Sequence, residues 1–464
     1  MTLRSQHMHS RARGMVRTAV LFMFAIFLAW LVITQSFAAY FAEFAPETAL
    51  WLQPTQPLAL DLLAERTLDL RRDLHPPSQG AADQMSVSAQ PSGSSEKSKS
   101  DSSTTQDSSH PAVLAPARAS EVRAWATSSL MNKPLNPWAL RILAQLEAID
   151  NDTSAASKLL NAAVRLSLHE SIAVYGTMLA AAKANDYKTA TYYADVLLRT
   201  RPELDKYVVP ILTKIVEDKT SSGLVEAVLD KNPPWRKRFF EVFPYSVEDA
   251  RTPLDFFLQL RTGAMPPTSG DITPYVWFLV RRKLYDLAYY TWLQFLPAEE
   301  LREAGLLFNG NFDVVPSGLP FDWLINQGSG VTVEVVPKPD SNGKHALLLD
   351  FAYGRVEYQS VRQLVMLTPG TYEFKGQYKG QLLGPRGLKW RIACESGPTL
   401  EESPMIIGMT PSWKEIAFTF TVPAQDCRAQ YVKLDLDARM ASEQLISGSM
   451  MFDELQISRV ANPS

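Results

Sequence analysis

The sequence predicts a membrane-anchored chain whose body is α-helical first and β-stranded afterwards. Three observations support this fold class: an uncharged apolar segment near the N-terminus, helical periodicity in the middle, and alternating apolar residues in the last third. The chain has 464 residues, so two or three domains are expected. The expected divisions are a cytoplasmic tail (1–17), a transmembrane helix (18–42), a helical repeat domain (46–74 and 118–305), a disordered Ser-rich insertion (75–117) and an antiparallel β-sandwich (306–460).

The apolar segment near the N-terminus indicates where the protein resides. Residues 18–42 contain no charged side chain and, at ~1.5 Å per residue, can cross a hydrocarbon layer of ~30 Å. Four arginines and no acid precede this segment, which favours a cytoplasmic N-terminus, a body in the periplasm and the bacterial inner membrane as partner. A cleaved signal peptide is the alternative, with Ser36 and Ala38 as its processing site.

The Ser-rich insertion interrupts a helical pattern. It contains no aromatic residue and few large aliphatic ones, so it cannot form a core. Its two flanks share six identical positions at an offset of 80 residues: Pro54/Pro134, Pro57/Pro137, Ala59/Ala139, Leu60/Leu140, Leu63/Leu143 and Ala64/Ala144. Proline is accommodated at the first turn of a helix, so both flanks begin helices. We interpret them as one repeat opened by the insertion, with chance similarity as the alternative.

Two helix pairs follow, over residues 136–168 and 170–200. Ala156 and Ala190 lie 34 residues apart at matching places in the two pairs, and Pro202 ends the second. This pattern resembles the tetratricopeptide repeat, a 34-residue helix–turn–helix unit with small residues at the helix crossings. The resemblance implies an α-solenoid that binds a protein partner, here an envelope protein.

From about Leu306 the period of the apolar residues changes from 3.6 to 2. Alternating runs cover residues 331–336, 346–351, 371–378, 388–394, 414–422, 431–437 and 450–457. Turn signals such as residues 339–343 and Pro369-Gly370 separate them. Many short strands without intervening helices predict an antiparallel sandwich or jelly roll.

Short motifs at the two ends of this domain point to a family. It opens with residues 309–313 (Asn-Gly-Asn-Phe-Asp) and closes with Phe452-Asp453. This order resembles the jelly-roll carbohydrate-binding modules of the galactose-binding-like superfamily. The resemblance implies glycan binding, and Asp313 and Asp453 match the places of the two acids that bind a structural calcium ion in many of these modules. No cofactor other than this structural calcium is expected. An unoccupied site or a plain salt bridge is the alternative for these two acids.

Sugar binding requires exposed aromatic faces and a few hydrogen-bonding side chains. The candidates in the predicted sandwich are Trp323, Tyr358, Trp390, Arg355 and Arg391. Packing in the core or against the helical domain is the alternative for the aromatic candidates. Trp413 lies between alternating strand positions and is expected in the core.

Both cysteines of the chain, Cys394 and Cys427, fall in the predicted sandwich beside strands. In an oxidising compartment two cysteines of one domain are expected to form a disulfide. Two buried free thiols are the alternative.

Charge and motif content limit the function classes. Lys and Arg total 46 against 49 Asp and Glu, which argues against nucleic-acid binding. Only His169 and His345 lie in segments expected to fold, so a His/Cys zinc cluster is excluded. The sequence has no glycine-rich phosphate loop, HExxH or GxSxG motif. The acids Glu395, Glu401 and Glu402 are interpreted as a solvated loop rather than a glycosidase pair.

The order of anchor, repeats and jelly roll resembles bacterial proteins found among exopolysaccharide-production genes. The resemblance implies a non-catalytic periplasmic scaffold whose helices bind an envelope protein and whose sandwich binds a polysaccharide or docks on the same assembly. A glycan-modifying enzyme with an unrecognised site and a purely structural assembly factor are the two alternatives.

Overall fold

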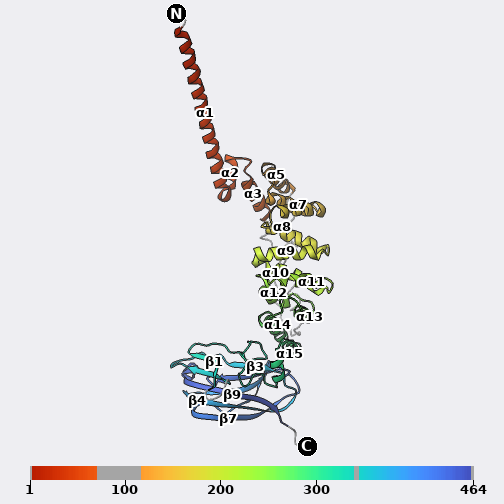
Figure 1. The fold of residues 1–464 in the computed structure, drawn as a ribbon, viewed down its shortest axis with the longest axis vertical. Helices are drawn as coiled ribbons and strands as arrows, with labels where there is room; N and C mark the ends of the chain where they lie inside the picture. The colour runs from red at the N-terminus through yellow and green to blue at the C-terminus, as the bar shows by residue number, and fades with distance from the viewer. Residues whose placement is uncertain (1–2, 70–115, 339–343, 461–464) are drawn as a thin grey trace, which may run out of the picture. The chain divides into compact units, whose positions relative to one another are not determined.

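The computed structural model describes residues 3–69, 116–338 and 344–460. The chain divides into two compact units, Met1–Arg201 and Pro202–Ser464. Figure 1 colours the chain from red at helix α1 to blue at the last strands. Helices beyond Pro202 therefore belong to the same unit as the strands, and the change of secondary structure near residue 306 does not separate the two units.

The first unit is helical throughout its described residues. Proline begins α2, α3, α5 and α6, where its missing N–H costs no helical hydrogen bond. Asp152 and Asp186 cap α7 and α9 by accepting from the backbone N–H groups of Ala155 and Thr189. The elements are α1 (Leu3–Phe44), α2 (Pro46–Leu52), α3 (Pro57–Asp69), α5 (Pro116–Asn132), α6 (Pro137–Ile149), α7 (Thr153–Leu166), α8 (Ser171–Lys183) and α9 (Tyr187–Thr200).

Helix α1 contains the apolar segment. Its portion Val20–Phe44 is long and apolar enough to cross a membrane, and a signal sequence would meet the same criterion. Large apolar side chains such as Phe22, Phe24 and Phe27 are exposed along it. An unpartnered apolar surface of this kind is stable in lipid rather than in water.

The helices that flank the Ser-rich insertion pack against each other. Ala64 of α3 shares one core cluster with Val122 and Ala126 of α5 and with Ile142 and Leu146 of α6. The predicted insertion (75–117) lies outside the described residues except for Pro116 and Ala117, which begin α5, and residues 70–74 also lie outside them. The helix before the insertion thus packs against both the first and the second helix after it, and the interpretation of the two similar flanks as one opened repeat stays a prediction.

A buried arginine links three helices of this unit. The Arg141 guanidinium on α6 forms ion pairs with Glu65 of α3 at 2.9 Å and with Glu170, the residue before α8, at 2.8 Å. Asn136 donates to the buried carboxylate of Asp61 at 2.6 Å. Burial raises the pKa of Glu170 and of Asp61, so both carboxylates depend on these partners to remain charged.

The second unit begins with short helices. Phe239, Phe240, Phe243, Phe256 and Phe257 form their buried aromatic core. The elements are η1 (Pro202–Leu204), α10 (Asp205–Glu217), α11 (Ser222–Leu229), α12 (Arg236–Val242), η2 (Phe243–Tyr245), α13 (Thr252–Leu260), α14 (Ser269–Arg281), α15 (Tyr285–Gln294) and α16 (Ala298–Glu303).

Two antiparallel sheets follow and confirm the predicted β-sandwich. One sheet has the order β1-β2-β9-β4-β7 and the other β3-β8-β5-β6. Side chains from both sheets share one core, as Phe374 and Trp390 show with ring centroids 5.3 Å apart. The strands are β1 (Val331–Pro337), β2 (His345–Phe351), β3 (Val361–Val365), β4 (Gly370–Leu383), β5 (Leu388–Cys394), β6 (Thr399–Glu402), β7 (Gly408–Val422), β8 (Gln430–Leu436) and β9 (Ser447–Arg459), with the short helix η3 (Ala441–Gln444) before β9.

The Asn-Gly segment that opens the domain lies directly against the last strand. The Leu455 N–H donates to the Gly310 carbonyl at 2.9 Å, and a Cβ at position 310 would overlap the Leu455 carbonyl. Glycine is therefore required by a close backbone approach.

The predicted disulfide is present. Cys394 and Cys427 are bonded, with their Cα atoms 5.1 Å apart. The next residue on each side contacts the start of α15: Glu395 accepts from the Tyr285 hydroxyl at 2.5 Å, and Arg428 pairs with Asp286 at 2.5 Å. Burial, together with the Glu395 carboxylate, raises the pKa of Tyr285 to about 12, so this hydroxyl remains a donor.

Replacing Arg141 should destabilise the helical unit strongly. R141M leaves Glu65 and Glu170 without their shared cation, and breaking such a buried pair costs about 3–5 kcal/mol. Urea unfolding followed by circular dichroism measures the loss. The control R199M removes the exposed pair with Asp195 and should change the unfolding free energy by about 0.5 kcal/mol or less. Equal effects of the two substitutions would contradict the structural role of Arg141.

Removing the disulfide should destabilise the second unit. The bridge spans 33 positions, and the double substitution C394S/C427S should cost about 3 kcal/mol because the unfolded chain regains the entropy of the opened loop. Guanidinium unfolding of the parent, with and without reductant, provides the reference. A reduced parent as stable as the oxidised one would show that the bridge contributes nothing.

Candidate functional site

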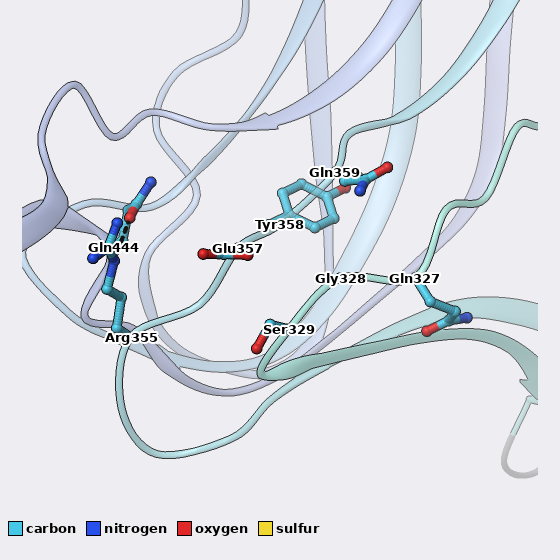
Figure 2. A pocket seen from close by; sticks show the side chains of 8 residues that line it. All are labelled: Gln327, Gly328, Ser329, Arg355, Glu357, Tyr358, Gln359 and Gln444. Carbon is cyan, nitrogen blue, oxygen red and sulfur yellow. Dashed lines mark hydrogen bonds between the residues drawn. The ribbon is translucent and has the colours of Figure 1, made fainter.

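A polar cavity of about 510 Å³ lies on the surface of the β-sandwich, where three loop segments meet. One segment precedes β1, one joins β2 to β3, and the third contains η3. The side chains and backbone that line it are those of Gln327, Gly328, Ser329, Arg355, Glu357, Tyr358, Gln359 and Gln444, shown in Figure 2.

Hydrogen bonds hold the three segments together. The Glu357 N–H donates to the Ser329 carbonyl at 2.8 Å, and the Val356 N–H donates to the Gln444 carbonyl at 3.0 Å. Figure 2 shows the Arg355 Nε bonded to Gln444 Oε1, at 2.9 Å. The side chains of the cavity are therefore presented on a braced backbone rather than on independent loops.

Gln327 and Gly328 fix the segment before β1. The Gln327 amide donates to the Val333 carbonyl at 2.8 Å, which ties this segment to β1. A Cβ at Gly328 would overlap the Glu357 carbonyl, so only glycine allows the two segments to approach this closely.

Tyr358 contributes its ring to the cavity. Its hydroxyl donates to the Leu434 carbonyl at 2.9 Å and accepts from the Val361 N–H at 3.1 Å. Burial raises the pKa of this phenol, so the hydroxyl stays protonated and engaged with β8 and β3. The hydroxyl is therefore already used within the protein, and Tyr358 contributes carbon atoms rather than a free hydroxyl to the cavity.

The exposed groups of the lining combine donors and acceptors. Arg355 and Glu357 carry opposite charges on exposed side chains, and Gln359 adds an exposed amide. Tyr353 stands in the same loop and is 98% exposed. Gly354 separates it from Arg355 with φ 129°, a backbone conformation that favours glycine, so the chain turns sharply between the two side chains.

Two of the five predicted sugar-binding residues, Arg355 and Tyr358, lie in this cavity. Sequence reasoning missed Glu357 and Gln444 of the lining, and it missed the exposed Tyr353, which stands in the same loop but outside the lining. The Tyr-Gly turn directly after a predicted strand was a usable signal for Tyr353, but no local pattern marks Gln444, which reaches the cavity from a distant loop.

The prediction that Trp323 and Trp390 line a groove is wrong. Both side chains are 0% exposed, and their ring centroids lie 5.9 Å apart in the core. The Trp323 indole N–H donates to the Asn309 carbonyl at 2.8 Å. Rings of this size stabilise the fold most when both faces are removed from water, and both tryptophans occupy inward-facing positions.

Arg391 also lies outside the cavity. It points away from the core on β5 and forms ion pairs with Glu402 at 3.1 Å, Asp435 at 3.3 Å and Asp437 at 2.5 Å. Glu402 also accepts from Lys389, and this hydrogen bond lowers the pKa of the carboxyl. The charges of Arg391 and Glu402 are thus neutralised by ion pairs on the surface of this sheet.

The acids proposed for calcium have other partners. Asp313 accepts from the His345 N–H at 2.9 Å and from the Asn311 amide at 2.8 Å. Asp453 is buried and forms an ion pair with Lys338.

This donor set does not fit calcium. A calcium ion takes six to eight oxygen ligands, and the described part of the chain has no group of three or more His, Cys, Asp or Glu residues able to hold a metal. Lys338 already neutralises Asp453. Its Nζ lies 4.5 Å from the ring centroid of Trp413, which is half-buried over the ammonium group rather than in the core as expected.

Neither a family model nor a curated protein matches the chain. Solved structures match the strand-rich third. A CBM4 structure is 17% identical over 33% of this chain and 99% of that chain, with a TM-score of 0.25. TmCBM61 in complex with β-1,4-galactotriose is 17% identical over 34% of this chain and 99% of that chain, with a TM-score of 0.23. The CBM22-1 xylan-binding domain from Paenibacillus barcinonensis Xyn10C is 18% identical over 30% of this chain and 87% of that chain, with a TM-score of 0.21. At these identities and TM-scores, the likenesses assign no ligand to this chain.

The sandwich should not depend on calcium, and it should depend on Lys338. K338A leaves the buried Asp453 carboxylate unpaired and should lower the unfolding free energy by about 3–5 kcal/mol. A calcium chelator should leave the melting temperature of the parent unchanged. K375A, which removes the exposed pair with Glu373, is the matched control and should be nearly neutral. A lower melting temperature of the parent in chelator would restore the calcium hypothesis.

Proposed function

We propose that the β-sandwich binds a saccharide in the cavity that contains Arg355, Glu357 and Gln444. The observation that carries this proposal is the braced polar cavity itself, with exposed donors and acceptors around a tyrosine ring. Sugar hydroxyl groups both donate and accept hydrogen bonds, so a site that binds them needs groups of both kinds.

Each part of the cavity has a role in this proposal. Arg355 donates to ring or hydroxyl oxygens, and Glu357 accepts from hydroxyl groups. Gln359 supplies both functions through its amide. Beside the cavity, the exposed ring of Tyr353 in the same loop stacks on the apolar face of a sugar that extends beyond the lining. Because backbone hydrogen bonds hold the loops, little conformational entropy is lost on binding.

We propose binding without catalysis. Glycoside hydrolysis by the common mechanism uses two carboxylates about 5–9.5 Å apart across the scissile bond. Glu357 is the single carboxylate of the described lining, and Glu402 is committed to Lys389 and Arg391. The cavity is therefore better suited to holding a sugar than to cleaving one.

We further propose that α1 tethers the chain to a bacterial inner membrane, with the arginine-rich N-terminus in the cytoplasm and the body in the periplasm. The apolar span and the disulfide support this placement, since disulfides persist in the periplasm. The helix pairs, which resemble tetratricopeptide repeats, would bind an envelope protein in polysaccharide production or export.

Titration of the full chain in nanodiscs with a panel of bacterial polysaccharides tests the proposed site. R355A and Y353S should each weaken binding of the recognised saccharide about tenfold, since a charged hydrogen bond or a stacked ring contributes about 1.5 kcal/mol. Y290S changes an exposed tyrosine of α15 and is the matched control that should bind normally. Unchanged binding by R355A and Y353S would overturn the site. Lack of binding by the whole panel would favour the purely structural assembly factor.

A further inference from the structure

Trp51 is exposed on the short helix α2. Its side chain is 82% accessible, and it stands seven residues beyond the end of α1. A tryptophan buries a large apolar area when it is covered, so exposure to this extent points to a surface that meets something other than water.

The position of α2 is set by the last turn of α1. Ala42 of α1, Ala49 of α2 and Ala59 of α3 are fully buried in one cluster, and Phe41 and Leu50 pack against it. Small residues at the contact let the three helices approach closely. The helix that carries Trp51 is therefore fastened to the end of the apolar span.

The length of α1 places this cluster at the membrane surface. The 25 residues of Val20–Phe44 rise about 37 Å, whereas the hydrocarbon core of a bilayer is ~30 Å thick and the whole bilayer ~40–45 Å. The last turn of the span thus reaches the headgroup layer. Helix α2 is only about 10 Å long, so Trp51 remains near that layer, which tryptophan side chains favour.

Two further apolar side chains lie at the same end of the helices. The Ser129 hydroxyl on α5 donates to the Pro57 carbonyl at 3.4 Å, which brings the α5–α6 turn beside the start of α3. Met131 and Leu135 of this turn region are 79% and 72% exposed. We group these two side chains with Trp51, which stands six residues before the start of α3, and call the three exposed residues the basal surface.

We propose that the basal surface of Trp51, Met131 and Leu135 inserts into the headgroup layer of the bilayer that α1 crosses. This inference rests on the proposed membrane anchor. Lipid is the occupant because α2, which carries Trp51, packs through the buried Ala42–Ala49–Ala59 cluster on the last turn of α1, whose apolar side chains are exposed along the proposed span. The second contact holds the base of the helical unit against the membrane, so that the unit cannot pivot freely about α1.

Differences in tryptophan fluorescence test the proposal in the full chain. The parent and its W51F, W30F and W413F variants are placed in phosphatidylcholine nanodiscs without bromine, with bromine on acyl carbons close to the headgroup, or with bromine near the ends of the acyl chains. Subtracting each variant from the parent isolates the emission of Trp51, of Trp30 in the span and of Trp413 in the sandwich. Bromine close to the headgroup should quench the emission of Trp51 severalfold, bromine near the ends of the acyl chains should quench that of Trp30, and neither should change that of Trp413.

The outcomes separate the inference from the anchor. Quenching of Trp30 without quenching of Trp51 would overturn the basal contact and leave the anchor intact. Absence of quenching at both would overturn the anchor as well. In the same nanodiscs, hydroxyl radicals should oxidise Met131 several times more slowly than Met409, a similarly exposed methionine of the sandwich. Equal oxidation of the two methionines would exclude Met131 from the contact.

Discussion

Burial of Trp323 and Trp390 between the two sheets is the constraint on which the sandwich depends. Trp390 packs against Phe374 of β4 and Phe452 of β9, and Trp323 packs against Phe312 of the opening segment. The two rings thus hold both sheets and the first residues of the domain in one core. The strands packed in this core fix the positions where the cavity loops begin and end. Backbone hydrogen bonds can therefore join these loops to one another.

Charged residues have two roles: some are held in ion pairs that stabilise the fold, and a few are exposed in the cavity. Lys338 forms an ion pair with Asp453, and Arg141 forms ion pairs with Glu65 and Glu170. Arg391 forms ion pairs with acids of its own sheet. These pairs neutralise carboxylates that burial would otherwise destabilise. Arg355, by contrast, is exposed in the cavity and, among the described residues, its side chain bonds the Gln444 amide through Nε, so the rest of its guanidinium is available to the proposed saccharide.

The sandwich is also joined to the helices that precede it. The disulfide holds Glu395 and Arg428 where both contact α15, and Trp292 of α15 packs against Phe308 and Phe321 with ring centroids 5.1 and 5.6 Å apart. The β-sandwich, fixed in this way, cannot move independently of α15. The cavity is therefore held rigidly relative to α15 and is not carried on a flexible linker.

The sequence by itself determined the apolar span, the alternating strands and the pairing of Cys394 with Cys427. Each of these rests on a local period or a composition, which short-range sterics and burial translate directly into structure. Only the tertiary structure decided which aromatic rings face the core, because alternation places a side chain on one side of a strand without saying which side the second sheet covers. It also brought Gln444 to Arg355 and Lys338 to Asp453, since contacts between residues distant in the chain depend on how the loops and strands pack.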